Sequence, residues 1–206
     1  MSNLKTIFWV VGFLLLGIII WQRFLPRPFV YPNEEIKTSV EDPTGSLKIS
    51  ITNGVKHAIP LEEIYDGGPG KDGIPSIDQP KFISVEQAKN NFDQEGLGLV
   101  VTLNGEDRFY PYQILVWHEL VNDNIGNTPV LVSFCPLCGS GLVFDRRVNG
   151  EIFEFGVSGK LHNSDLLMYD RKTDSLWQQI LGKAVVGPLT NTELKQLPAN
   201  VIPFKI

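Results

Sequence analysis

The two cysteines of this 206-residue chain, Cys135 and Cys138, lie three positions apart in the stretch CPLCG. This spacing is typical of half a zinc site, of a tight disulfide, or of a reactive thiol beside a second thiol. A zinc ion takes four protein ligands in structural sites and three in catalytic sites. Because the sequence holds no second pair of cysteines, other residue types must complete any metal site.

Histidines are the natural partners, because thiolates together with imidazoles suit zinc or copper(I). Of the three histidines, His118 and His162 lie nearer to the cysteines in the sequence than His57. The leading prediction is therefore a domain that binds a soft metal, copper or zinc, through Cys135, Cys138, His118 and His162.

Three other interpretations of the cysteine pair stay open. The pair forms a structural or redox-active disulfide if the domain lies in an oxidising compartment. Alternatively, one cysteine is the nucleophile of a cysteine-dependent enzyme, with His118 or His162 as its base. In the third interpretation the cysteines only close a turn, and the long loop from Tyr65 to Pro80, rich in glycine and proline, binds an envelope protein.

A second group of candidate residues follows the cysteines, within residues 156–179. Several are ordinary turn residues. Others alternate with large apolar residues, so some polar side chains face inward, where they need hydrogen-bonding partners. The candidates for the site in this segment are Asn163, Ser164, Asp165, Tyr169, Asp170, Trp177 and Gln178.

The pair Asn149–Gly150 favours a two-residue type I′ turn between two alternating strands. Such a turn places Asp145 directly opposite Glu154, and like charges in that position are destabilising. Either Arg147, diagonally opposite Glu154, neutralises the pair, or a cation or shared proton lies between the two carboxylates. Asp145 and Glu154 therefore join the candidate site residues.

Short apolar runs separated by glycine, asparagine and aspartate predict a mainly β fold. We expect a barrel or sandwich-like antiparallel sheet with a few short helices, that is, a β-rich α+β domain. Ser84 to Phe92 and Asn191 to Pro198 are predicted to be helical. Gln113 to Asn122 is either a short helix or a buried strand, because a continuous apolar run does not discriminate between them.

The N-terminal residues 1–29 are predicted to be a membrane anchor, because Ile7 to Trp21 carries no charge and has Trp9 and Trp21 near its two ends, where tryptophans favour the membrane interfaces. A cleaved signal peptide is less favoured, since no small-residue cleavage site follows. Residues 30–44 are predicted to be a linker, and residues 45–206 a single domain on the extracytoplasmic side. Arg23 and Arg27, after the apolar stretch, slightly oppose that orientation.

The charge of the chain argues against nucleic acid as a partner. Residues 1–30 hold three of the 18 basic residues and no acidic one, which leaves 15 basic and 23 acidic residues, a net charge of −8, for the rest. The expected partners are the membrane, through the N-terminal helix, and possible envelope proteins; the sequence specifies no small-molecule substrate.

Several blocks, among them WHELVND, SFCPLCGSGLVFDR and HNSDLLMYDRKTDSLWQQ, resemble a prokaryotic family catalogued only as a domain of unknown function. The resemblance covers roughly Asp72 to Pro198. It implies an extracytoplasmic or membrane-anchored protein and brings no established reaction, substrate or cofactor. The positions that the family signature marks are His118, Cys135, Cys138, Asp145, Arg146, Asn163, Ser164, Asp165, Tyr169, Asp170, Trp177 and Gln178.

Overall fold

The computed structural model describes residues 27–28, 38–40 and 48–205. Most of the predicted membrane anchor and most of the predicted linker lie outside the described residues. Within the described part of the chain, no helix has the length and apolar character that crossing a membrane requires.

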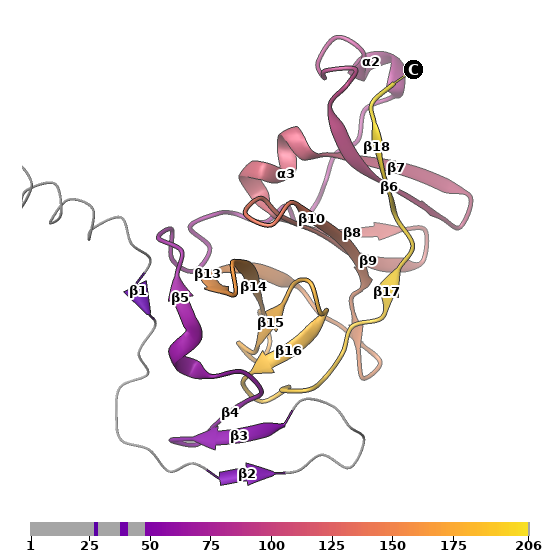
Figure 1. The fold of residues 1–206 in the computed structure, drawn as a ribbon. Helices are drawn as coiled ribbons and strands as arrows, with labels where there is room; N and C mark the ends of the chain where they lie inside the picture. The colour runs from indigo at the N-terminus through magenta and orange to yellow at the C-terminus, as the bar shows by residue number, and fades with distance from the viewer. Residues whose placement is uncertain (1–26, 29–37, 41–47, 206) are drawn as a thin grey trace, which may run out of the picture.

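Three antiparallel sheets are stacked from one end of the molecule to the other (Figure 1). Sheet A, which curls into half a barrel, has the order β1–β5–β13–β14–β15–β16–β4–β3–β2. Its strands are β1 (Arg27–Pro28), β2 (Thr38–Val40), β3 (Ile49–Thr52), β4 (Val55–His57), β5 (Ile64–Asp66), β13 (Phe155–His162), β14 (Asp165–Asp170), β15 (Leu176–Gln178) and β16 (Lys183–Val186).

Sheet B lies in the middle of the stack, and sheet C lies at the end that carries the C-terminus (Figure 1). Sheet B has the order β17 (Gln196–Leu197), β10 (Ser140–Asp145), β9 (Thr128–Cys135) and β8 (Leu120–Ile125). Sheet C has the order β18 (Asn200–Pro203), β6 (Leu97–Leu103) and β7 (Glu106–Pro111). The small ribbon β11 (Arg147–Val148)–β12 (Glu151–Ile152) and the helices η1 (Leu61–Glu63), α2 (Val85–Ala88) and α3 (Tyr112–His118) complete the described elements.

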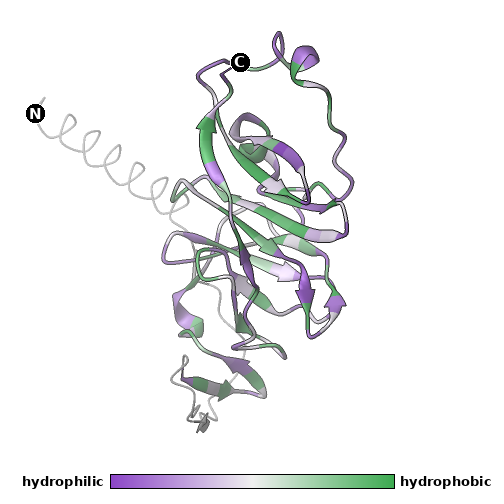
Figure 2. Ribbon diagram, turned by 90° about the vertical axis from the view of Figure 1, so that its right-hand side faces the viewer, coloured by the Kyte–Doolittle hydropathy of each residue, from purple (hydrophilic) through white to green (hydrophobic). Residues whose placement is uncertain are grey.

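Strand β9 of sheet B is buried on both faces, which explains why apolar residues predominate along it. Leu131 and Cys135 pack into the core between sheets A and B, where Trp177 is fully buried. The alternate residues Val130 and Val132 pack into a second core, between sheets B and C. Because side chains alternate along a strand, a strand between two cores is expected to be apolar at most positions on both faces. Figure 2 shows this concentration of hydrophobic residues in the inner strands.

The fold agrees with the predicted mainly β class, with a few short helices. Ser84 caps α2 with a capping box, but this helix ends at Ala88, earlier than expected. The ambiguous run from Gln113 to Asn122 contains both alternatives: most of it belongs to α3, and its end begins β8. The predicted helix from Asn191 to Pro198 is wrong, because β17 forms there on the edge of sheet B.

The turn at Asn149–Gly150 is confirmed, since Val148 pairs with Glu151 on either side of it. The predicted pairing of Asp145 with Glu154 is wrong, because the two strands diverge after this short ribbon. Asp145 ends β10 and pairs with Val130 of β9 instead. The hydrophobic surfaces of two different sheets draw the flanking strands apart, and local turn chemistry does not anticipate this.

Residues 67–80, which we call the strap, have no regular structure but are bonded to sheets A and B. The backbone amides of Gly67 and Asp72 donate to the carbonyl oxygens of Gly159 and Val157, over 2.7 and 2.8 Å. The amide of Ile77 donates to the carbonyl of Leu120 over 2.9 Å. The strap is therefore an integral part of the fold and not a free loop.

Candidate metal centre

Both cysteines lie in the hairpin that joins β9 to β10. Cys135 is the last residue of β9, is fully buried, and pairs with Ser140. The intervening loop turns back because the amide of Gly139, at a φ of 66°, donates to the carbonyl of Cys135 over 2.8 Å. Glycine suits this left-handed position. Cys138, inside the loop, is exposed.

A carboxylate from sheet A meets the two thiols. Asn163 and Ser164, at φ values of 52° and 62°, form the two-residue turn between β13 and β14. Positive φ at both positions is typical of a type I′ turn. The turn delivers Asp165 as the first residue of β14, where its side chain is buried and one oxygen accepts a 3.0 Å hydrogen bond from the Ile180 amide.

The two sulfur atoms and a carboxylate oxygen of Asp165 all lie within 4.8 Å of one another. The Cys138 Sγ and the Asp165 Oδ1 are 3.7 Å apart. Zinc bonds of about 2.0–2.3 Å at tetrahedral angles separate neighbouring sulfur and oxygen ligands by roughly 3.5 Å. The two thiols are free, so no disulfide joins them. This spacing fits three ligands of one metal ion.

A chain of hydrogen bonds supports the exposed thiol. The Ser140 hydroxyl lies 3.0 Å from the Cys138 Sγ and donates to the Gln179 Oε1 over 2.8 Å. The amide group of Gln179, fully buried, donates in turn to the Ser133 hydroxyl over 3.1 Å. The sequence interpretation singled out Gln178 and missed Gln179. Only its position in the polar segment could have drawn attention to it.

Burial dominates the electrostatics of the centre. Burial, and to a smaller extent the hydrogen bond with the Cys138 thiol, together raise the pKa of the Cys135 thiol to about 12. Burial likewise raises the pKa of Asp165, although the Ile180 amide acts in the opposite direction. A cation would compensate for the desolvated negative charges, since a bound metal favours the deprotonated form of its ligands.

The structure places both candidate histidines outside this group. His118 ends α3, and its Nδ1 donates to the Pro75 carbonyl over 2.8 Å. His162 is buried between Gln178 and Glu63, at 3.0 Å from the Gln178 Oε1 and 3.3 Å from the Glu63 carboxylate. Among the residues that the structure describes, the third ligand beside the cysteines is thus a carboxylate and not an imidazole.

Asp170 and Trp177 serve the turn after β14. The fully buried Asp170 carboxylate accepts hydrogen bonds from the Trp177 indole over 2.9 Å and from the Thr173 hydroxyl over 2.8 Å. The Thr173 amide donates to the same carboxylate over 2.6 Å. These donors hold the hairpin between β14 and β15, so the two candidates stabilise sheet A at a place separate from the cysteines.

The remaining candidates also have structural partners. Asp145 forms a 2.6 Å ion pair with Arg147, two residues further along the chain in β11, and not with a residue across the hairpin. Glu154 is exposed and pairs with Arg171 over 3.2 Å. The hydroxyl of Tyr169 donates to Asp72 of the strap over 2.6 Å.

Arg146 binds backbone oxygens instead of a ligand. Its buried guanidinium donates to the carbonyl oxygens of Val130, Phe153 and Asp123 over 3.1, 2.8 and 2.9 Å. These bonds join sheet B to the segment that leads into β13. Because a buried charge must have partners, Arg146 is a structural centre of the domain.

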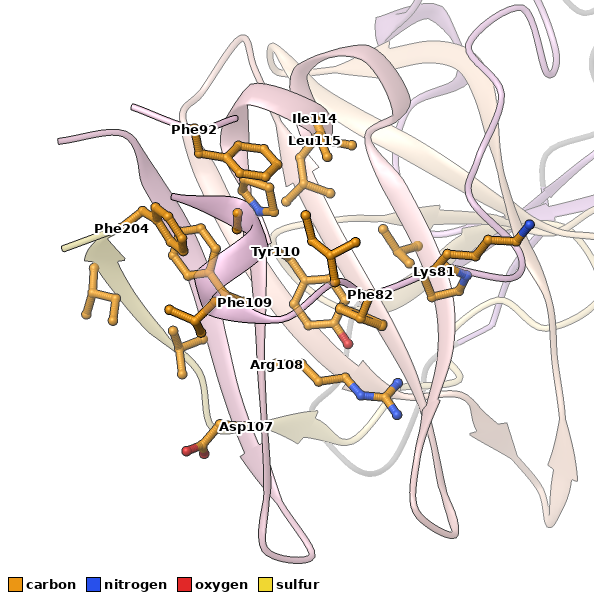
Figure 3. Close-up of a pocket in the computed structure, with 18 of the residues that line it drawn as sticks. Lys81, Phe82, Phe92, Asp107, Arg108, Phe109, Tyr110, Ile114, Leu115 and Phe204 are labelled. Atoms are coloured by element: carbon orange, nitrogen blue, oxygen red, sulfur yellow. The ribbon is translucent and has the colours of Figure 1, made fainter. Parts of the chain in front are cut away.

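A separate cavity of about 730 Å³ lies between sheet C, α3 and the segment around α2 (Figure 3). Aromatic and aliphatic side chains line most of it, and Phe82 packs edge-on against Tyr110. Two of its polar lining residues bind a buried carboxylate behind it: Arg108 and the Tyr110 hydroxyl both donate to Asp123, over 2.5 and 2.6 Å. The cavity offers an apolar surface but no pair of groups arranged for chemistry.

Fold and site together define a β-rich domain with a cysteine and carboxylate group that is able to hold a metal ion. Residues 71–206 match the family described as "Protein of unknown function (DUF3179)", and the chain belongs to this family. No curated protein and no solved structure matches the chain.

Proposed function

We propose that this protein binds a soft metal ion, most favourably zinc, through Cys135, Cys138 and Asp165. The observation that carries the proposal is the convergence of these three ligand atoms within 4.8 Å. They come from two hairpins in two different sheets, so neither hairpin alone brings them together. Thiolate and carboxylate are both established zinc ligands.

The carboxylate favours zinc over copper(I). Soft thiolates accept either metal, whereas carboxylate oxygen is a hard donor that zinc binds readily at about 2.0–2.2 Å. A copper(I) site is expected to use sulfur or imidazole ligands instead. Copper therefore remains the second metal to test.

An enzyme that uses either thiol as a nucleophile has less support. A reactive cysteine needs a neighbouring base or a lowered pKa. His118 and His162 are held by other partners, and burial raises the pKa of Cys135. We also propose that residues 1–29 anchor the domain to the extracytoplasmic side of a membrane, where a bound metal would protect the two thiols from oxidation.

The test is zinc titration of the untagged full-length chain, reduced with a phosphine so that no added thiol competes. We expect one equivalent to bind. Replacing a residue that only hydrogen-bonds a metal ligand typically reduces metal affinity about 10–100-fold. Cys138→Ser and Asp165→Asn remove ligands themselves, so each should reduce the zinc affinity by at least this factor. Cys138 is exposed, so its replacement is expected to leave the fold intact.

The matched control is Asp174→Asn, which changes an exposed aspartate in the next hairpin of sheet A. It should bind zinc as the wild type does. Absence of zinc binding by the wild type, or equal affinity of Cys138→Ser and wild type, would overturn the proposal. A copper(I) titration of the same variants shows which of the two metals the site prefers.

A further inference from the structure

The candidate metal centre is one ligand short of a closed tetrahedral site. Three ligands come from the described residues. The whole sequence contains no other cysteine, and its three histidines lie within the described part of the chain. His118 and His162 are hydrogen-bonded elsewhere, and His57 binds the Ile59 carbonyl and the Thr52 hydroxyl. Sites with three protein ligands leave one position for an external ligand.

Exposed apolar residues lie in the two turns that carry or bind the ligands. Leu137, next to Cys138, is 66 % exposed. Ile180 and Leu181 follow Gln179 in the next turn, and they are 53 % and 47 % exposed. The backbone amide of Ile180 is the one that donates to Asp165. We call these three residues the collar. Large apolar side chains that flank an exposed ligand favour an external molecule with an apolar body.

The charge of the centre selects the donor atom. Two thiolates and a carboxylate bring three negative charges to an ion with two positive charges, so the occupied centre is already negative. An anionic fourth ligand would add to this excess and be repelled by it. Among the residue-type ligands that zinc prefers, the imidazole nitrogen is the neutral one.

We propose that the fourth position takes a neutral nitrogen ligand of the imidazole type from outside the chain, with an apolar substituent against the collar. This inference rests on the proposed metal site. The ligand binds through a nitrogen lone pair and displaces a water molecule. No proton or electron is transferred in this step.

The experiment uses the untagged full-length chain loaded with cobalt(II), a spectroscopic substitute for zinc. Titration with imidazole should shift the ligand-field bands at one-to-one stoichiometry, while the sulfur-to-cobalt absorption persists. Acetate and a small thiol should produce no such saturable shift. We expect 4-phenylimidazole to bind several-fold more tightly than imidazole, because its ring covers the collar.

Variants separate the collar from the metal ligands. Leu137→Asp should bind cobalt normally but lose the preference for 4-phenylimidazole. Ile152→Asp, at an exposed isoleucine on β12, should keep it. If cobalt binds and imidazole leaves the spectrum unchanged, or the thiol binds equally well, the inference is overturned and the metal site stands. If cobalt itself does not bind, both fail.

Discussion

At the scale of single residues, Glu119 is a carboxylate whose ionisation is coupled to folding. It follows α3 at a φ of 58° and is half-buried where the chain enters β8. Burial raises its pKa from an ordinary 4.5 to about 7. A group whose pKa is raised by folding stabilises the protein fully below its unfolded pKa, and this stabilisation is lost as the pH rises through about 7.

We therefore expect Glu119→Gln to gain stability relative to the wild type as the pH rises. The amide cannot ionise, so it avoids the cost of a buried negative charge. Thermal melting at about pH 4 and about pH 8 measures the effect. The difference in Tm, variant minus wild type, should become more positive at the higher pH.

Glu62→Gln is the control, since Glu62 is exposed in η1. Its difference in Tm should be nearly the same at both pH values. If the Glu119→Gln difference in Tm is also the same at both pH values, the Glu119 carboxylate is solvated and its pKa does not change on folding.

The candidate site also shows which properties of single residues the sequence can predict. Cys135, Cys138 and Asp165 could each be identified as candidates from their type and neighbours. Their meeting could not, because it depends on how sheets A and B stack, and no sequence spacing reports that stacking. The preference for histidine over aspartate followed ligand chemistry alone, while hydrogen bonds to other partners hold both histidines elsewhere.

At the scale of elements, the strap shows how side chains hold an irregular segment on a sheet. The Tyr169 hydroxyl donates to Asp72, and Lys71 lies 4.2 Å from the centre of the Tyr169 ring. Burial and the Asp72 carboxylate raise the pKa of Tyr169 to about 12, so the hydroxyl stays a donor at neutral pH. Arg171 adds a 2.8 Å ion pair with Asp78 at the other end of the strap.

Removing the hydroxyl with Tyr169→Phe should destabilise the domain by about 1.5–3 kcal/mol, the usual contribution of a hydrogen bond to a charged group. Denaturant unfolding measures this loss. Hydrogen exchange should also become faster at the amide of Asp72, whose bond to the Val157 carbonyl lies beside the lost contact.

Tyr65→Phe is the matched control, because Tyr65 in β5 is 38 % exposed. It should change neither the free energy of unfolding nor the exchange of the strap by a comparable amount. Unchanged exchange at Asp72 in Tyr169→Phe would mean that the backbone bonds alone hold the strap.

Turns were the most predictable elements. The pair Asn149–Gly150 sets its hairpin, because positive φ at two successive positions restricts the choice of residues. How far the paired strands continue was not predictable. After Asn149–Gly150 the ladder ends within two residues, because β10 joins sheet B and β13 joins sheet A.

At the scale of the whole molecule, the stack of sheets gives the two thiols opposite accessibility. Cys135 is fully buried between sheets A and B, while Cys138 is exposed at the edge of the stack. Because Cys138 is the exposed thiol, a reagent that cannot cross a membrane labels the domain only from the side on which it lies. This permits a direct test of the proposed extracytoplasmic orientation.

We expect a membrane-impermeant maleimide to label the full-length chain in right-side-out vesicles, after treatment with a phosphine and a chelator. Inverted vesicles should be labelled only once detergent opens them. Cys138→Ser should abolish the label, while Cys135→Ser should retain it, since only Cys138 is exposed. Labelling of inverted vesicles alone would reverse the orientation that the sequence favours, and recovery of the chain in the soluble fraction would refute the anchor.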